Sequence, residues 1–192
     1  MKKALVVGLV LAGTLMMTGC SSKFEPTEST VFVTSKGTVK SAVMELFEES
    51  YYDFDELTKD IQESVDEYCG EGKEGAITIE ALTEVEDLVT LQMNYASVAD
   101  YAEFNDVILF SGTVAEAIAA GYQPKNLVDV QGQPVELTEE ESQLKVIVTE
   151  EAICIQTQGR IKCASKNVTI MDKKLAKALE AEKSELAFVL YK

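Results

Sequence analysis

The sequence predicts an α+β fold with a mainly antiparallel sheet, or two such sheets, and three to four short helices. Segments in which apolar and polar residues alternate follow one another with short connections, which is typical of half-buried antiparallel strands. A few stretches with helical spacing and recognisable capping residues lie between them. Runs of strands interrupted by isolated helices indicate the α+β class.

The predicted domain begins with a β-branched strand, Thr30–Thr34, which is expected to pair with Val39–Phe47 across a short turn. A helix then starts at Asp53, whose side chain can cap it, and Gly70 is expected to end it in a left-handed conformation. One face of this helix is apolar at helical spacing, through Phe54, Leu57, Ile61, Val65 and Tyr68.

The middle of the chain predicts a hairpin and two more helices. Ile77–Ala81 and Val89–Tyr95 alternate in polarity, with Thr83–Glu86 as their connection. Ser97 is expected to cap a helix that reaches about Phe104. Thr113, followed three residues later by Glu116, forms the capping box of another helix, which Gly121 ends. The apolar Val107–Phe110 run between these helices is interpreted as a buried strand.

The last third of the chain is dominated by strand-like segments. A helix is predicted at Lys173–Glu182, which is rich in Ala, Leu, Lys and Glu. The predicted strands are Asn126–Gln131, Leu144–Thr149, Ala152–Thr157, Arg160–Ser165, Asn167–Met171 and Leu186–Leu190.

The N-terminus has the layout of a secretory signal. Lys2 and Lys3 precede an uncharged apolar run, Ala4–Met17, and small residues stand directly before Cys20. The run is shorter than the roughly 20 apolar residues of a membrane-spanning helix. These features predict a signal peptide over residues 1–19.

The sequence MMTGC, which ends at Cys20, resembles the lipobox of bacterial lipoproteins. The resemblance implies cleavage before Cys20, a diacyl group on its sulfur and attachment to the membrane through that lipid. Two acyl chains suffice for stable anchoring. Residues 20–29 would then be the lipidated N-terminus and tether, and residues 30–192 a single α+β domain. The alternatives are an ordinary signal peptide followed by a cysteine, or an uncleaved apolar anchor.

The stretch DYAEFNDVILFSGTVAEAIAAGY, Asp100 to Tyr122, together with TVFVTSKGTV near the start of the domain, resembles lipoproteins of anaerobic Firmicutes. Those proteins are known to us only as uncharacterised. The resemblance therefore implies an exported lipoprotein but carries over no site residues.

Composition excludes several classes of function. The chain has no histidine, which excludes histidine-based catalytic triads and histidine-ligated zinc. Its net charge is −16, and a surface this acidic repels nucleic-acid phosphates. We therefore expect no nucleic-acid partner, and no motif indicates a cofactor.

Two cysteines form a candidate disulfide. If Gln158-Gly159 is a two-residue hairpin turn, Cys154 faces Cys163 as a non-hydrogen-bonded pair. Such pairs bring Cα atoms to about 4.5 Å, within disulfide range. Two reduced thiols are the alternative. Cys69 has no partner by count and is interpreted as a helix-end residue.

Other patterns are weaker. Ser142 to Lys145 has the S-x-x-K spacing of penicillin-recognising enzymes, but the motif continues into a predicted strand and lacks its companion elements. The acidic residues from Asp53 to Asp60 lack the loop of an EF-hand. We expect neither a catalytic nor a metal site from these patterns.

The leading hypothesis is a non-enzymatic, lipid-anchored protein on the outer face of a bacterial cytoplasmic membrane. It would bind another envelope protein, a peptide or a glycan. The alternative is a carboxylate-dependent hydrolase of cell-wall glycan or peptide, which requires a cleft with two acids about 5–9 Å apart, one with a raised pKa.

Overall fold

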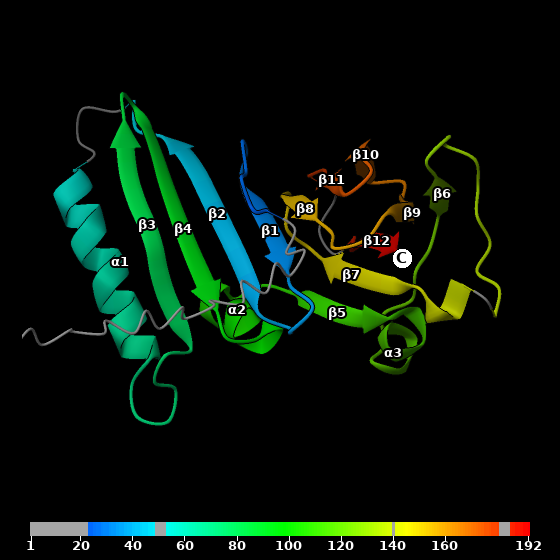
Figure 1. Ribbon diagram of the computed structural model, residues 1–192, viewed down its shortest axis with the longest axis horizontal. Coiled ribbons are helices and arrows are strands. Elements are labelled where there is room, and N and C mark those ends of the chain that lie inside the picture. Colours follow the sequence, from blue (N-terminus) through cyan, green and yellow to red (C-terminus); the bar gives the residue numbers. More distant parts are fainter. Residues whose placement is uncertain (1–22, 49–52, 140, 181–184) are drawn as a thin grey trace, which may run out of the picture.

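The computed structural model of the protein describes residues 23–48, 53–139, 141–180 and 185–192. The molecule is elongated and contains two β-sheets, which overlap at one end of the larger sheet (Figure 1). The predicted α+β class is confirmed, because the described residues combine two mostly antiparallel sheets with three α-helices. The predicted signal peptide and Cys20 lie outside the described residues.

The larger sheet has seven strands in the described chain. Neighbouring strands are antiparallel except β1 and β8, which run parallel. In spatial order the strands are β10 (Val168–Asp172), β11 (Leu175–Ala178), β8 (Cys154–Gln156), β1 (Thr30–Val33), β2 (Val39–Leu46), β4 (Leu88–Tyr95) and β3 (Ile77–Val85).

The smaller sheet has five strands in the described chain, all antiparallel to their neighbours. The chain enters it three times after residue 144, alternating with visits to the larger sheet. In spatial order its strands are β5 (Leu109–Thr113), β7 (Lys145–Thr149), β12 (Ala187–Tyr191), β9 (Ile161–Ser165) and β6 (Leu127–Asp129).

Three α-helices begin at the predicted capping residues. They are α1 (Phe54–Tyr68), α2 (Val98–Asn105) and α3 (Val114–Ala119), and a 3₁₀ turn, η1, spans Glu141–Gln143. The Asp53 carboxylate accepts hydrogen bonds from the first turn of α1, Ser97 caps α2, and Thr113 with Glu116 forms a complete capping box on α3. The expected role of Gly70 is wrong: Cys69 caps the C-terminus of α1, and Gly72 has the positive φ.

The main hydrophobic core lies between the two sheets. Alternate residues of β12 point to opposite sides, so Val189 and Tyr191 pack toward the larger sheet, where they meet Ile155 and Val31. The opposite face of the smaller sheet forms a second cluster with α3, in which Leu190 packs with Val114. Strands β7 and β12 are buried on both faces, which explains their nearly unbroken apolar sequences.

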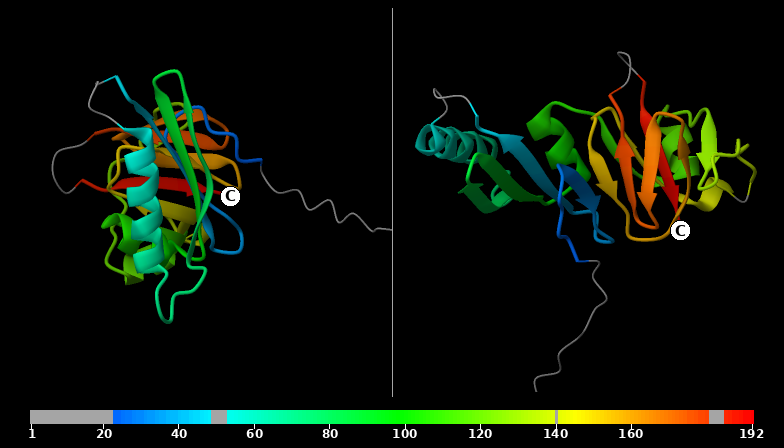
Figure 2. Two further views of the ribbon diagram at one scale, coloured as in Figure 1. Left: turned by 90° about the vertical axis from the view of Figure 1, so that its left-hand side faces the viewer. Right: turned by 90° about the horizontal axis from the view of Figure 1, so that it is seen from above.

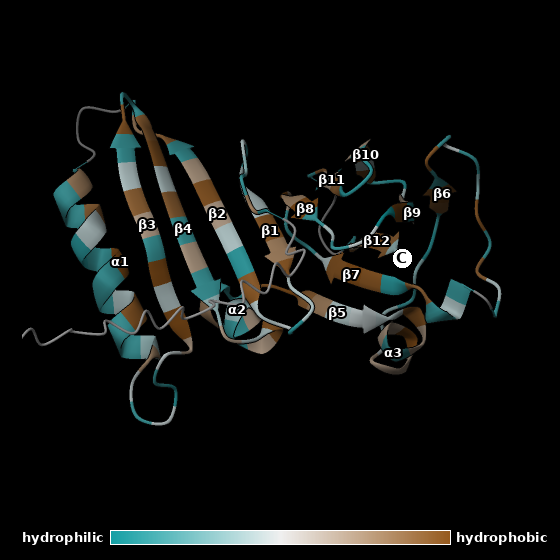
Figure 3. Cartoon of the chain, viewed as in Figure 1, coloured by the Kyte–Doolittle hydropathy of each residue, from teal (hydrophilic) through white to brown (hydrophobic). Residues whose placement is uncertain are grey.

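The other end of the larger sheet is covered by helices. α1 and α2 pack on the face of β2, β3 and β4 that carries Ile77, Met93 and Tyr95 (Figures 1 and 2). Along these strands, apolar and polar bands alternate as the sequence predicts (Figure 3). Val65 is the buried residue of the α1 stripe.

The helix predicted at Lys173–Glu182 is wrong. Its described part contains strand β11, which pairs with β8 and β10. Ala176 and Ala178 are buried at alternate positions, because small side chains fit between the closely packed sheets. Burial and strand pairing here override a composition that favours helix.

Several strand boundaries also differ from the prediction, and the differences at β5 and β3 are the largest. β5 begins at Leu109 rather than Val107 and continues to the cap of α3. β3 continues to Val85, so the hairpin turn is the two-residue Glu86-Asp87, in which Glu86 has a φ of 56°.

The described part of the predicted tether, residues 23–29, contacts the larger sheet. Phe24 stacks on Phe32 with ring centroids 6.1 Å apart, and Gln156 Nε2 donates to the Lys23 carbonyl at 3.1 Å. Glu28 forms an ion pair with Lys177 of β11. This part of the segment is therefore docked on the fold.

Candidate functional site

A pocket of 660 Å³ lies at one end of the five-stranded sheet. It is formed by residues of β7, β9 and β12 and by the chain between β6 and β7. Its apolar lining includes Val135 and Leu144, and its charged lining consists of Lys145, Lys162, Lys192 and Glu141. This volume is in the range of small-molecule sites, about 300–1,000 Å³.

The order of the strands brings the three lysines together. β12 lies between β7 and β9 and is antiparallel to both, so the start of β7, the end of β12 and the start of β9 meet at one end of the sheet. Lys145 starts β7, Lys162 is the second residue of β9, and Lys192 directly follows β12. The lysines are distant in sequence, and no motif links them. No pattern in the sequence therefore predicted this site.

A β-bulge shapes the wall of the pocket. Leu190 pairs with Cys163, but the next residue, Tyr191, pairs with Ile161, so Lys162 has no partner across the strand. Consecutive side chains of a regular strand point to opposite faces. Here both Lys162 and Cys163 line the pocket, because a bulge re-aims side chains locally.

The two other reactive groups of the pocket are unsuited to catalysis at neutral pH. Burial, together with Glu141 and Asp129, raises the pKa of Cys163 to about 11, so its sulfur stays a protonated thiol. The Glu141 carboxylate accepts hydrogen bonds from the hydroxyl and backbone N–H of Thr138, and these bonds lower its pKa. Glu141 therefore stays ionised.

The geometric argument for a Cys154–Cys163 disulfide is wrong. β8 and β9 are not a hairpin, because they belong to different sheets. Cys154 pairs with Thr30 and Lys177, and Cys163 pairs with Leu190 and Asp129. Both cysteines are free thiols in the structure.

Gln158-Gly159, which the sequence predicts as the hairpin turn between the two cysteines, lies in the segment that carries the chain from one sheet to the other. Thr157 N–H donates to the Lys174 carbonyl at 2.8 Å, whereas Arg160 N–H donates to the Lys192 carbonyl at 2.8 Å. Gly159 lies so close to Lys192 that a Cβ atom added to it would stand 2.2 Å from that carbonyl oxygen. The glycine therefore serves a close backbone approach, not a hairpin turn.

Cys69 and Cys154, which lie outside the 660 Å³ pocket, contact structural elements of the fold. Cys69 Sγ accepts from the Ile77 N–H at 3.4 Å and lies 3.6 Å from the Ile77 carbonyl oxygen, so it joins the end of α1 to the start of β3. Cys154 lines a cavity of 320 Å³ beside the Glu28–Lys177 ion pair. Burial and Glu28 raise the pKa of the Cys154 thiol.

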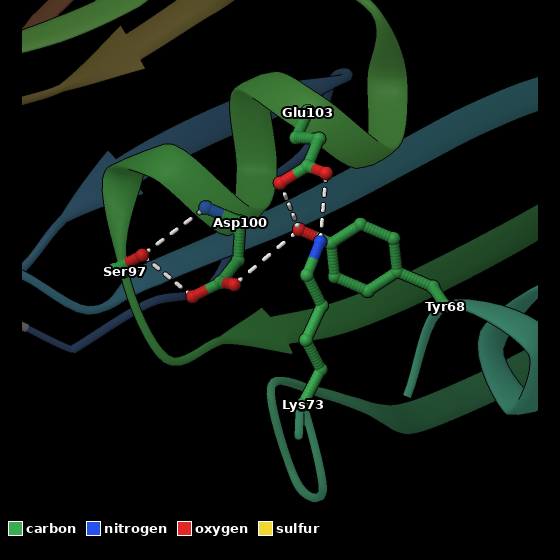
Figure 4. A network of polar contacts seen from close by, with 5 residues as sticks. All are labelled: Tyr68, Lys73, Ser97, Asp100 and Glu103. Atoms are coloured by element: carbon green, nitrogen blue, oxygen red, sulfur yellow. Dashed lines mark hydrogen bonds and ion pairs between the residues drawn. The ribbon is translucent and has the colours of Figure 1, made fainter. Parts of the chain in front are cut away.

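A polar network connects the end of α1 to α2 (Figure 4). The Tyr68 hydroxyl lies 3.3 Å from Asp100 Oδ1 and 3.1 Å from Glu103 Oε2. Lys73 Nζ is 2.7 Å from Glu103 Oε1 and 3.9 Å from the centroid of the Tyr68 ring, a cation–π geometry. Ser97, the cap of α2, donates to Asp100 Oδ2 at 2.5 Å. These contacts fasten α1 to α2.

This network contains the arrangement nearest to a two-carboxylate site, because Asp100 and Glu103 reach one hydroxyl. A glycosidase needs one acid with a raised pKa. The hydrogen bonds from Lys73 and Tyr68 instead lower the pKa of Glu103. The network therefore fits a structural role better than hydrolysis.

The carboxylate with a raised pKa lies elsewhere. Glu151 follows β7, and its two oxygens lie 3.1 and 2.9 Å from the hydroxyl of the buried Tyr101. Burial raises the pKa of Glu151 and that of Tyr101. Tyr95 packs edge-on against Tyr101 with ring centroids 4.9 Å apart. Glu151 is half-buried, and both of its oxygens face the hydroxyl of a buried tyrosine.

The S-x-x-K resemblance does not produce a catalytic geometry. Ser142 lies in the 3₁₀ turn η1, where its hydroxyl donates to the Glu139 carbonyl at 2.6 Å, and Lys145 lies on a strand. Within the described residues, no group of three or more acidic or cysteine side chains is placed to hold a metal ion.

Across the described part of the chain, no helix combines the length and the apolar character needed to cross a membrane. No protein-family model matches the sequence, and the comparisons with curated proteins and with solved structures found no match.

Proposed function

We propose that the protein is a non-enzymatic, lipid-anchored binding protein of the bacterial cell envelope. Cys20 carries the lipid that holds it on the outer face of the cytoplasmic membrane, and the pocket at the end of the five-stranded sheet takes up a peptide or glycan of the envelope. The 660 Å³ pocket is the observation that carries the binding role.

The lipid anchor is supported by the sequence pattern that ends in MMTGC at Cys20. A binding role is supported over hydrolysis by the side chains of the pocket. Among the described residues that line it, Glu141 has the one acidic side chain, and the hydrogen bonds that it accepts from Thr138 favour its ionised form. Such a group cannot serve as the general acid of a hydrolase.

The anchor is tested by replacing Cys20 with serine in cells that produce the full chain. We expect the wild type in the membrane fraction, processed and labelled by a radioactive or alkyne-bearing fatty acid. The C20S chain should be unlabelled and should keep its signal peptide. Fatty-acid labelling of C20S equal to wild type would refute the anchor.

The binding role is tested with the mature protein purified in detergent. Thermal unfolding is followed in the presence of uncharged and charged wall sugars and of short peptides. A ligand at 100 times its dissociation constant stabilises the folded state by about 2.7 kcal/mol, which shifts the melting temperature by several degrees. A cooperative melt that no sugar or peptide shifts would contradict the proposed role of the pocket.

A further inference from the structure

We infer that the pocket binds an anionic ligand, with a carboxylate or phosphate group among the ammonium groups of Lys145, Lys162 and Lys192 and an apolar part against Val135 and Leu144. This inference rests on the proposed function, because it names the class of ligand that the binding pocket takes.

Positive charge is concentrated at this pocket although the protein as a whole is acidic. The chain has 33 acidic and 17 basic residues, yet the pocket is lined by three lysines and one glutamate. The positive charges that line the pocket attract an anion.

Among the described residues, the ammonium groups of Lys162 and Lys192 form no ion pair, whereas the charge of Lys145 helps to lower the pKa of the Glu116 carboxyl group. Across the described residues, the ion pairs engage Lys23, Lys40, Lys59, Lys73 and Lys177. Within the part of the chain that the structure describes, neither an ion pair nor a side-chain hydrogen bond involves the ammonium group of Lys145, Lys162 or Lys192. The charges of Lys162 and Lys192 therefore remain available to a ligand, and that of Lys145 is shared with Glu116.

The β-bulge at Lys162 also supports an anionic ligand. It interrupts the pairing of β9 with β12 and lets Lys162 and Cys163 both line the pocket. A bulge costs regular strand pairing, and bulges are found preferentially next to sites where a side chain has to be re-aimed. In this pocket the bulge adds one more positive charge.

The residue type and the lining limit the chemistry of the ligand. Lysine acts as a point charge and does not demand the planar, two-pronged geometry that arginine prefers, so carboxylate and phosphate both fit. The apolar lining and the volume of 660 Å³ favour a ligand larger than an inorganic ion. A sugar acid, an acidic peptide or a sugar phosphate of the envelope meets these conditions.

The test uses matched pairs of probes that differ in charge. N-acetylmuramic acid is N-acetylglucosamine with an added lactyl carboxylate, and glycerol phosphate is glycerol with an added phosphate. Each is titrated calorimetrically into the detergent-purified protein. We expect the anionic member of at least one pair to bind at least about tenfold more tightly, and its affinity to fall as salt is raised. The pair that responds identifies the anion.

The variant Lys162→Gln should weaken binding of the anionic probe at least about tenfold, because it removes one charge from the pocket. Lys145→Gln provides an independent second variant. The matched control is Lys59→Gln, which removes the same charge from the exposed face of α1 at the far end of the molecule. It should leave the affinity within about twofold.

Different failures have different meanings. Equal affinity for the charged and uncharged members, unchanged by Lys162→Gln, would overturn the inference and leave the binding function intact. Loss of affinity in Lys59→Gln equal to that in Lys162→Gln would overturn the assignment to this pocket. If no probe of either charge binds and no neutral wall sugar or peptide shifts the melt, the inference and the proposed function both fail.

Discussion

Glu151 shows how one residue can make stability depend on pH. Its carboxylate lies against the Tyr101 hydroxyl, and burial raises its pKa above the ordinary value of 4.5. The neighbouring Glu150 raises it further, whereas the hydrogen bond from Tyr101 opposes the rise. The folded protein therefore keeps a proton on Glu151 at pH values at which the unfolded chain has lost it.

The sign of the effect follows from this difference in bound protons. As pH rises from about 4.5 through the raised pKa, the folded state loses stability, because it binds more protons than the unfolded state there. We expect Glu151→Gln to reduce this loss. The free energy of unfolding of the variant, relative to that of the wild type, should therefore be larger at pH 7 than at pH 4. Urea unfolding of both proteins across pH 4–8 measures this pH dependence.

Glu84→Gln is the matched control, since Glu84 is exposed on the β3–β4 hairpin. It removes the same charge and should leave the shape of the pH profile unchanged. A profile of Glu151→Gln that is parallel to that of the wild type would show that Glu151 is not the source.

At the scale of elements, the chain between β8 and β9 shows how a crossover differs from a hairpin. A hairpin would pair its two strands with each other, whereas here β8 pairs with β1 and β11, and β9 pairs with β12 and β6. The crossover is held by hydrogen bonds to Lys174 on one side and Lys192 on the other. Gly159 is the position at which its backbone comes closest to the end of β12.

We expect Gly159→Ala to destabilise the protein by about 1–3 kcal/mol, because the new methyl group collides with backbone atoms that cannot move without breaking the crossover. Chemical unfolding monitored by circular dichroism measures this. Gly70→Ala is the control: its nearest neighbour would be at 3.3 Å and its φ is not positive, so its effect should be small. Equal stability of the two variants would contradict the close approach.

At the scale of the whole molecule, the chain alternates between two sheets, and this separates residues that are close in sequence. Cys154 lies in the seven-stranded sheet and Cys163 in the five-stranded sheet. The same alternation places β12 between β7 and β9 and thereby assembles the lysines of the pocket. The alternation of the chain between the two sheets therefore both forms the pocket and separates Cys154 from Cys163.

We therefore expect Cys154 and Cys163 to remain thiols in the protein isolated without reductant. Denaturation with an alkylating agent, followed by intact-mass measurement and peptide mapping, should show both cysteines labelled. A peptide that joins the two cysteines and appears only without reductant would contradict the two-sheet arrangement. The Cys154→Ser variant should show Cys163 labelled as in the wild type.

The local features of the fold could be predicted from the sequence because short-range interactions decide them. Capping side chains bond to backbone groups two or three residues away, so the starts of α1, α2 and α3 were predicted correctly. Alternating polarity likewise predicted the β3–β4 hairpin, although the position of its turn was wrong. The α+β class follows from these elements together, and the signal pattern at Cys20 is itself a matter of sequence.

Tertiary structure alone decided the features that depend on distant partners. Lys173–Glu182 has the composition of a helix, but burial of Ala176 and Ala178 between strands made part of it β11. Whether β8 pairs with β9 depends on the competition of all other strands for the same hydrogen bonds, which no local pattern reveals. The lysines of the pocket converge for the same reason: the order of strands in a sheet is set by global packing.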